Sequence, residues 1–206
     1  MNINSKLIEE AVDQLATLPG VGRKTALRFV LHLLKRDSNE VERFANAFIN
    51  LRENIRFCKT CFNLADADYC SICENPGRQS NLICVVEDIR DIMALESTQQ
   101  YRGTYHVLGG VISPMDGIGP SDLRIQELIE RVKETQPEEL ILALNTTMEG
   151  DTTCFYLYKK LKDTGVNIST LARGVAIGDD LEYTDEVTLG RSIRNRTPYE
   201  STLSTQ

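Results

Sequence analysis

The sequence lacks any apolar run of the roughly 18–20 residues that a membrane-spanning helix requires. Its opening stretch, MNINSKLIEEAVDQL, is polar and acidic and lacks the apolar centre of a signal peptide. Tryptophan is also absent, although the composition is otherwise ordinary for a globular protein. We therefore expect no membrane segment and a cytoplasmic location, where the reducing environment makes disulfides rare.

An excess of positive charge is lacking as well. The chain has 23 Lys and Arg against 30 Asp and Glu, a net charge of −7, which argues against a protein that coats nucleic acid through charge alone. The charge is uneven, because residues 1–57 carry nine basic against seven acidic side chains and residues 58–206 carry 14 against 23. Phosphate contacts are therefore expected near the N-terminus and an acidic face elsewhere.

Four of the six cysteines lie in the stretch FCKTCFNLADADYCSICEN, as two Cys-x-x-Cys pairs: Cys58 with Cys61, and Cys70 with Cys73. Two such turns supply the four soft ligands of a tetrahedral Zn²⁺, and four thiolates leave no open position, as in a structural site. Redox Cys-x-x-Cys motifs usually occur singly beside a βαβ unit. The spacing predicts one structural Zn²⁺ per chain, whereas Cys84 and Cys154 lie in apolar surroundings and are expected as buried thiols.

The stretch LPGVGRKTALRFVLHLLK, residues 18–35, separates a helical pattern over residues 5–17 from a second helix. A phosphate-binding P-loop is excluded here because the Gly-x-x-x-x-Gly-Lys spacing is missing and a helix, not a strand, comes before it. In a helix–hairpin–helix, by contrast, small residues such as Gly20 and Gly22 expose backbone N–H groups that bind a phosphate.

Basic side chains follow that turn. Lys24 and Arg28 lie four residues apart, hence on one face of the second helix, beside the expected phosphate. No base-reading side chain is evident, so binding without sequence specificity is expected. The alternative is a plain turn between helices with solvated basic side chains. A third helix, residues 39–56, has an apolar stripe that includes Phe44 and Phe48 and predicts a core or subunit contact.

From residue 81 the pattern changes to alternating strands and helices. Strands are expected at residues 81–87, 104–110, 138–145 and 166–172. Helices are expected at residues 88–97, at 122–135 with Ser121 or Asp122 as its cap, and at 152–165. This alternation with short loops predicts a small parallel sheet covered by helices.

Acidic residues fall at the carboxyl ends of these expected strands, where sites of such sheets lie. Glu87 ends one strand, and Glu149 and Asp151 follow another. These carboxylates could hold Mg²⁺ for phosphoryl chemistry, or they could form an acidic rim that binds a basic partner. Spacing alone leaves both interpretations open.

The order of these segments resembles the bacterial recombination-mediator family RecR. The resemblance runs from about residue 5 to residue 199 and is most specific in GGVISPMDGIGP and ARGVAIGDDLEY. It implies an α+β chain of several modules: a helix–hairpin–helix DNA-binding domain (1–56), a four-cysteine zinc finger (57–74), a Toprim domain with a parallel sheet (80–176) and a C-terminal region (177–206) with a Walker-B-like segment and a role in assembly.

The resemblance also implies a function. Proteins of this family act in DNA repair and recombination with RecO and RecF, and help to load RecA onto single-stranded DNA. They form homotetrameric rings that can encircle DNA, single-stranded or duplex, in the cytoplasm at the nucleoid. A DNA clamp without enzymatic activity, and thus without catalytic residues, is therefore expected.

Site residues follow from the same resemblance. The DNA-contacting positions are Gly20, Gly22, Arg23, Lys24 and Arg28, although many relatives have proline where this chain has Arg23. The acids associated with RecO binding are Glu87, Asp91, Glu149 and Asp151, the last of which is glutamate in many relatives. On this basis a docking surface is favoured over a Mg²⁺ site at the Toprim acids.

Overall fold

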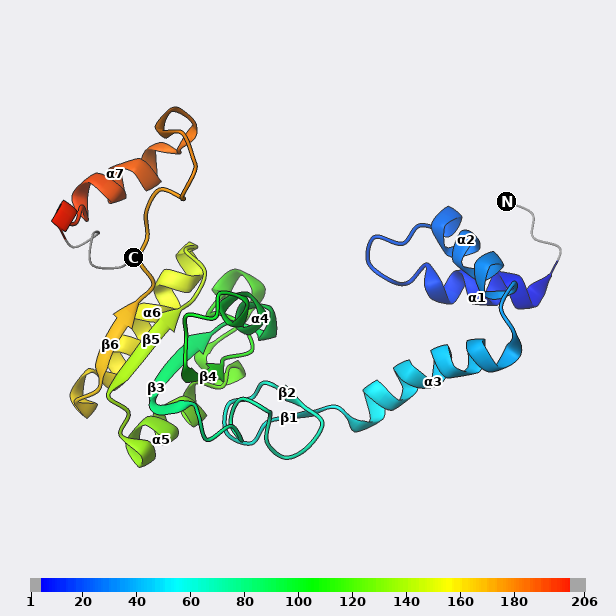
Figure 1. Cartoon of the computed structure of the whole chain (residues 1–206), viewed down its shortest axis with the longest axis horizontal. Coiled ribbons are helices and arrows are strands. Elements are labelled where there is room, and N and C mark those ends of the chain that lie inside the picture. The colour runs from blue at the N-terminus through cyan, green and yellow to red at the C-terminus, as the bar shows by residue number, and fades with distance from the viewer. Residues whose placement is uncertain (1–4, 201–206) are drawn as a thin grey trace. The chain divides into compact units, whose positions relative to one another are not determined.

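The structure is a computed structural model that describes residues 5–200. The chain divides into two compact units, Met1–Ile55 and Arg56–Gln206, each of which is described by itself (Figure 1). Residues 201–206 of the expected C-terminal region lie outside the described residues. No helix within residues 5–200 is both long and apolar enough to cross a membrane.

The first unit contains three helices: α1 (Lys6–Leu15), α2 (Arg23–Leu33) and α3 (Ser38–Asn54). The first two pack against each other through buried Val12, Ala26 and Val30. Between them the chain reverses at Gly20, whose φ of +77° lies in the left-handed region that glycine adopts without strain. The hairpin predicted between two helices is therefore present.

Helix α3 is different, because none of its residues is buried. Asp37 caps it by accepting a 2.9 Å hydrogen bond from the backbone N–H of Glu40. Phe44 and Phe48 contact each other edge to face, with ring centroids 5.1 Å apart, yet their side chains are 43% and 60% exposed. Of the two roles expected for this stripe, a core within the single chain is therefore wrong and a subunit contact remains.

The second unit is built on four parallel strands in the order β4-β3-β5-β6 (Figure 1). The strands are β3 (Gln79–Val86), β4 (Gly103–Val107), β5 (Glu139–Ala143) and β6 (Asn167–Thr170). The α-helices are α4 (Ile89–Ser97), α5 (Ile125–Thr135), α6 (Met148–Leu161) and α7 (Glu186–Arg194); short 3₁₀ turns are η1 (Pro114–Asp116), η2 (Pro120–Asp122), η3 (Lys162–Thr164) and η4 (Leu181–Tyr183). The predicted parallel sheet is confirmed.

Strand β3 shows why its sequence is apolar without alternation. Ile83 and Val85 face one core, which α5 and α6 complete, whereas Cys84 and Val86 face a second core with α4. Both faces of the strand are thus buried, as in parallel sheets covered on two sides. Cys84 is the buried thiol that its surroundings predicted, and Cys154 packs half-buried against the first core.

The cysteine-rich segment, which we call the knuckle (residues 56–75), belongs to the second unit. It contains a short antiparallel pair, β1 (Arg56–Phe57) with β2 (Leu64–Ala65). The backbone N–H of Val107, on edge strand β4, donates a 2.8 Å hydrogen bond to the carbonyl of Cys61. The ring of Phe62 meets that of His106 edge to face at 5.3 Å. The knuckle is therefore docked on the edge of the sheet.

Two helix starts differ from the expectation. The helix expected from residue 122 begins at Ile125, because Asp122 belongs to a 3₁₀ turn and its carboxylate accepts a 2.8 Å hydrogen bond from the N–H of Gly119. The helix expected from residue 152 begins at Met148, capped by Thr147. The acids Glu149 and Asp151 consequently lie in the first turn of α6 and not in a loop.

Candidate metal centre and nucleic-acid interface

The turn before α2 presents backbone donors and basic side chains together. Gly22 occupies the N-cap position, and no side chain in the described part of the chain caps the helix. The first-turn N–H groups of a helix lack partners inside the helix, so here they are available to an external acceptor. No acid lies in that turn to compete for them. The arrangement suits a phosphate group.

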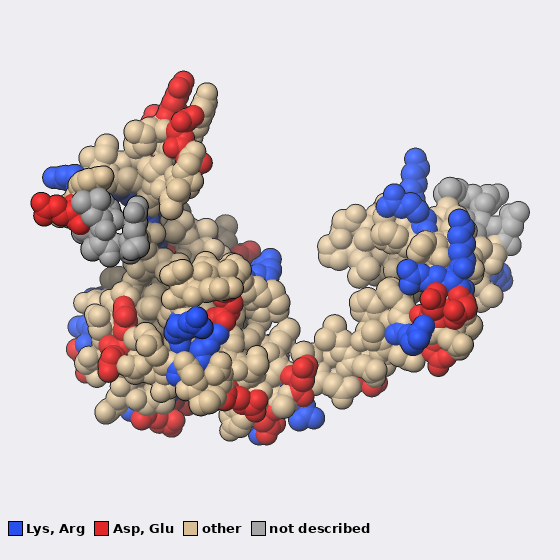
Figure 2. Space-filling model, in the orientation of Figure 1, with Lys and Arg blue, Asp and Glu red and all other residues tan. Residues whose placement is uncertain are grey.

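The three basic side chains near this turn are not equivalent. Arg23 forms an ion pair with Asp13 of α1, which commits its charge within the unit. Lys24 and Arg28 are exposed and form no ion pair among the described residues; the Arg28 guanidinium lies 5.6 Å from the ring centroid of Phe29. Figure 2 shows Lys and Arg side chains projecting from the surface of this unit. Lys24 and Arg28 are thus the charges best placed for an external phosphate.

The knuckle brings its four cysteines together. The sulfur atoms of Cys58, Cys61, Cys70 and Cys73 all lie within 4.8 Å of one another, and the sulfurs of Cys61 and Cys70 are 3.5 Å apart. None of the four forms a disulfide. Tetrahedral Zn²⁺ with bonds of about 2.3 Å requires sulfur–sulfur separations of about 3.8 Å. The donor set and its spacing therefore fit a closed zinc site.

The environment of the thiols also favours a bound cation. Burial raises the pKa of the Cys58 thiol, but the backbone N–H groups of Cys61, Cys70 and Thr60 lower it to about 7. The hydrogen bond with Cys73, together with burial, raises the pKa of Cys61 well above its ordinary value. Packed this closely, the four sulfurs cannot all ionise unless a cation compensates their charge.

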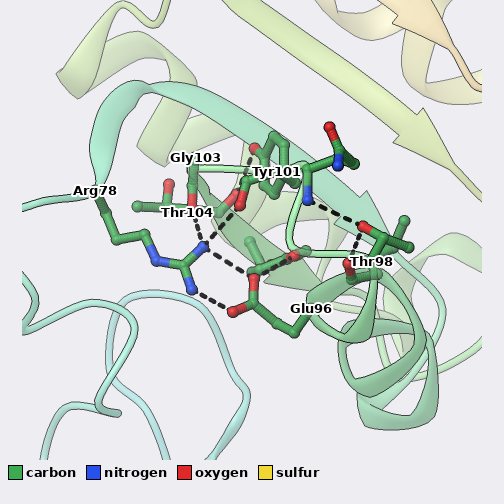
Figure 3. A network of polar contacts seen from close by, with 9 residues as sticks. Arg78, Glu96, Thr98, Tyr101, Gly103 and Thr104 are labelled. Atoms are coloured by element: carbon green, nitrogen blue, oxygen red, sulfur yellow. Dashed lines mark hydrogen bonds and ion pairs between the residues drawn. The ribbon is translucent and has the colours of Figure 1, made fainter. Parts of the chain in front are cut away.

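An ion pair fixes the point where the chain leaves the knuckle and enters the sheet (Figure 3). Arg78 forms a bidentate contact with Glu96 of α4 and also donates to the carbonyls of Tyr101 and Gly103, each at 3.3 Å. The hydroxyl of Tyr105 donates to Glu96 at 2.7 Å. Arg78 holds the pKa of the Glu96 carboxyl below its usual range. This network ties the start of β3 to α4 and β4.

The four acids Glu87, Asp91, Glu149 and Asp151, which we call the Toprim acids, all lie near the carboxyl edge of the sheet but have different partners. Glu87 accepts a 2.7 Å hydrogen bond from the side-chain amide of Asn145. Asp91 accepts from the backbone N–H groups of Glu87 and Asp88, at 3.1 and 3.0 Å, and thereby completes the capping box of α4, whose N-cap residue is Asp88. Asp151 accepts a 2.7 Å hydrogen bond from Arg173, which holds the pKa of its carboxyl below the usual range.

These acids do not converge on one point. Within residues 5–200, the knuckle thiols are the only group of three or more Cys, His, Asp and Glu side chains whose ligand atoms are gathered for a metal. A cavity of about 330 Å³ lies between α4 and the carboxyl ends of β5 and β6, and of the four acids only Asp91 lines it. It is lined by Asp91, Ala94, Leu95, Leu142, Ala143, Leu144, Asn145, Thr146, Thr170, Leu171, Ala172 and Arg173.

Sequence reasoning missed two arginines in this unit. Arg173 follows β6 by three residues, so the rule that sites lie at strand ends could have found it. Arg131 of α5 donates to the carbonyl of Thr60 in the knuckle, and no local signal marks a contact between positions 71 residues apart.

Comparison with known proteins agrees with these observations. Four family models match: the RecR helix-hairpin-helix over residues 8–51, the RecR zinc finger domain with four cysteines over 55–75, the Toprim domain over 81–172, and the RecR C-terminal model over 174–197. The relative named "Recombination protein RecR" from Bacteroides fragilis is 60% identical over 199 residues, which cover 97% of this chain and 97% of the relative. The relative of the same name from Phocaeicola vulgatus is 62% identical over 198 residues, which cover 96% of this chain and 97% of the relative.

A more distant relative of the same name, from Flavobacterium johnsoniae, is 54% identical over 203 residues, with 98% of each chain covered. All four modules of the family are therefore present in their order, and the similarity extends over nearly the full length of the relatives. The chain belongs to the RecR family.

Proposed function

We propose that this protein is a DNA-repair and recombination mediator that binds DNA without sequence specificity and acts with RecO and RecF to load RecA onto single-stranded DNA. The observation that carries the proposal is the uncapped start of α2, which offers backbone donors beside the exposed charges of Lys24 and Arg28. Gly20 and Gly22 shape the turn, and Arg23 supports it through Asp13. Such contacts bind phosphates and carry no sequence information.

Substitution of both basic residues tests the DNA interface. Lys24→Ala with Arg28→Ala should weaken binding to labelled single strands and duplexes, measured by fluorescence anisotropy across a salt series. The slope of log affinity against log salt for duplex should fall by up to about 1.8, since each phosphate contact contributes about 0.9. Lys35→Ala with Arg43→Ala is the matched control, because it removes the same charge from exposed positions of the same unit.

Equal losses in the two double variants would show that net charge, not the hairpin, drives binding. The remaining alternative is a protein-assembly hub with incidental basic residues. That alternative would be favoured if the parent protein failed to bind DNA at low salt even with RecO present.

We also propose that the four knuckle thiolates hold one structural Zn²⁺ per chain. When bound, the ion cross-links the two Cys-x-x-Cys turns of a segment too short to fold on an apolar core of its own. Elemental analysis of freshly purified, reduced protein should find one zinc per chain. A zinc content near zero would contradict the proposal.

The Toprim acids, in this proposal, form a docking surface for RecO and not a catalytic site. Two observations argue against a metal site: Asp91 is committed to the capping box of α4, and Arg173 already pairs with Asp151. The acid left for a basic partner is Glu149, which forms no ion pair among the described residues. A Mg²⁺-dependent nuclease or topoisomerase is the alternative. Incubation with supercoiled DNA and Mg²⁺ should leave the DNA unchanged. Cleavage or relaxation that disappears in Glu87→Gln would establish the enzyme instead.

The exposed stripe on α3 supports assembly into a homotetrameric ring. Phe44 and Phe48 are joined there by Leu51, which is 57% exposed. Apolar side chains gathered along one helix of a single chain usually mark a contact with another chain. A second copy of the chain, bound through this helix, is the proposed partner.

A further inference from the structure

Arg131 places a cation at the junction of three elements. It lies on α5, between the buried residues Leu128 and Val132. Its Nη1 donates to the carbonyl of Tyr105 at 2.6 Å and to the carbonyl of Thr60 at 3.3 Å, and its Nη2 donates to the Thr104 hydroxyl at 3.0 Å. Tyr105 and Thr104 belong to β4, whereas Thr60 lies in the first Cys-x-x-Cys turn of the knuckle.

No carboxylate within residues 5–200 neutralises this guanidinium. Arg131 forms no ion pair within the described residues, and its Nε is out of contact with solvent and has no hydrogen-bond partner. The three acceptors of Arg131 are neutral, and they bind only some of the N–H groups of its guanidinium. A buried cation without a counter-ion destabilises the fold. Arginine does not escape this cost by losing its proton.

The contact with Thr60 brings Arg131 to the first Cys-x-x-Cys turn, because Thr60 lies between Cys58 and Cys61. Burial lowers the pKa of Arg131, whereas charge on Cys73, Cys61 and Cys58 raises it, in that order. Arg124, the other arginine of this junction, is already paired with Glu127 at 2.8 Å and lies 5.1 Å from the ring centroid of Phe62. The two arginines thus contact the same knuckle, but only Arg131 lacks a carboxylate.

We propose that Arg131 is the counter-ion of the metal–thiolate centre and couples binding of the metal to docking of the knuckle on β4. The inference rests on the proposed zinc site. Four thiolates around Zn²⁺ leave a net charge of about −2, which one partly buried guanidinium reduces to about −1. Without the metal, protonated thiols would leave the partly buried guanidinium of Arg131 without a counter-ion. Metal loading should therefore stabilise the contact of Arg131 with Thr60, and Arg131 should strengthen metal binding.

Three variants separate charge from hydrogen bonding. Arg131→Gln removes the charge and keeps donor groups, Arg131→Lys keeps the charge and loses the planar fork, and Arg124→Gln is the matched control at the same junction. Zinc affinity of the reduced full-length chain is measured by competition with a chromophoric chelator. Groups that support metal ligands commonly contribute about 10–100-fold in affinity, so Arg131→Gln should lose roughly tenfold or more. Arg131→Lys should remain within about threefold of the parent, and Arg124→Gln should be unchanged.

The midpoint of thermal unfolding provides a second readout. If Arg131 is the counter-ion, the gain in midpoint on zinc loading should be smaller in Arg131→Gln than in the parent protein. A residue that only bridges backbone carbonyls would lower the midpoints of metal-free and loaded protein alike and leave zinc affinity unchanged.

The outcomes are distinguishable. Parent-like zinc affinity in Arg131→Gln overturns the inference, as does an equal loss in Arg131→Gln and Arg131→Lys, which would assign the effect to hydrogen-bond geometry. Should Arg131→Gln fail to fold, Arg131→Lys decides alone: affinity near that of the parent supports the role of charge, and a loss of about tenfold rejects it. If the parent protein itself binds no zinc, the proposed zinc site fails before Arg131 is tested.

Discussion

Arg173 donates a 2.7 Å hydrogen bond to the carboxylate of Asp151, joining the chain after the last strand to the first turn of α6. The side chains are 27% and 43% exposed, so the pair is partly shielded from water. A divalent ion at Asp151 would have to displace the guanidinium that already balances its charge. The second acid of the Glu-x-Asp pair is therefore held in an internal ion pair.

Arg173→Gln should raise the pKa of Asp151 toward its ordinary value, because Arg173 is the largest cause of its depression. A depressed carboxyl pKa contributes stability that is present above the unfolded-state pKa and is lost as pH falls through the folded-state pKa. Acid unfolding of the variant should therefore show a smaller contribution from this group. Carboxyl-carbon NMR titration measures the pKa directly. Arg194→Gln, on exposed α7, is the control, and equal Asp151 pKa values in both variants would contradict the assignment.

Most strands and helices of the second unit could be predicted from the sequence, because the strands are apolar and the connecting turns are short. The residue at which α6 begins could not be predicted in this way. The segment TTMEGD contains Gly150, which weakens a helical pattern. In the structure a Cβ at Gly150 would lie 2.0 Å from the carbonyl oxygen of Asn145, so glycine is needed where the helix passes close to the preceding loop. That close approach is a tertiary constraint with no local signature.

The candidate sites divide in the same way. The clustering of the four knuckle cysteines could be predicted from their spacing, since each Cys-x-x-Cys turn is formed by residues close in sequence. The partners of Arg131 and Arg173 are distant in sequence, and only the packed sheet brings them together. The apolar stripe of α3 was evident, but its periodicity alone could not distinguish a core from a subunit contact.

Removal of the metal should loosen the edge of the sheet where the knuckle docks. The backbone N–H of Val107 donates to the carbonyl of Cys61, so its protection depends on an ordered knuckle. Hydrogen exchange at Val107 should accelerate by about tenfold or more when a chelator removes zinc. The amide of Leu142, in central strand β5, serves as the control and should keep its protection. Unchanged exchange at Val107 would show that the knuckle keeps its fold without metal.

Phe48→Asp should disrupt the proposed assembly without unfolding the chain. The side chain is 60% exposed, so the stability of the single chain should change by no more than about 0.5 kcal/mol. A charge in an apolar contact between chains remains buried without a partner, which weakens association strongly. Light scattering after size-exclusion chromatography should report a smaller mass than for the parent. Met115→Asp, at a position 95% exposed in the second unit, is the control; the same loss of mass there would rule out a specific role for α3.

Glu149→Gln should weaken binding of RecO, whereas Asp91→Ala should chiefly destabilise the fold. Asp91 completes the capping box of α4, so the loss of its two backbone hydrogen bonds should cost about 1 kcal/mol in the free energy of unfolding. Glu149, in the first turn of α6, forms no ion pair among the residues that the structure describes, which leaves its charge for a basic partner. An exposed charge pair contributes up to about 1 kcal/mol, so a two- to fivefold loss of affinity is expected, decreasing at high salt.

Surface plasmon resonance across a salt series measures that affinity, with thermal unfolding of each variant alongside. Glu138→Gln is the matched control, since Glu138 precedes β5 and so lies at the opposite edge of the sheet from Glu149. Both variants lose one negative charge, and only one of them changes the carboxyl edge. A loss of RecO affinity confined to Glu149→Gln would show that RecO binds at the carboxyl edge of the sheet, because net charge alone predicts equal effects at the two positions. Equal losses would instead mean that RecO is attracted by the acidic unit as a whole.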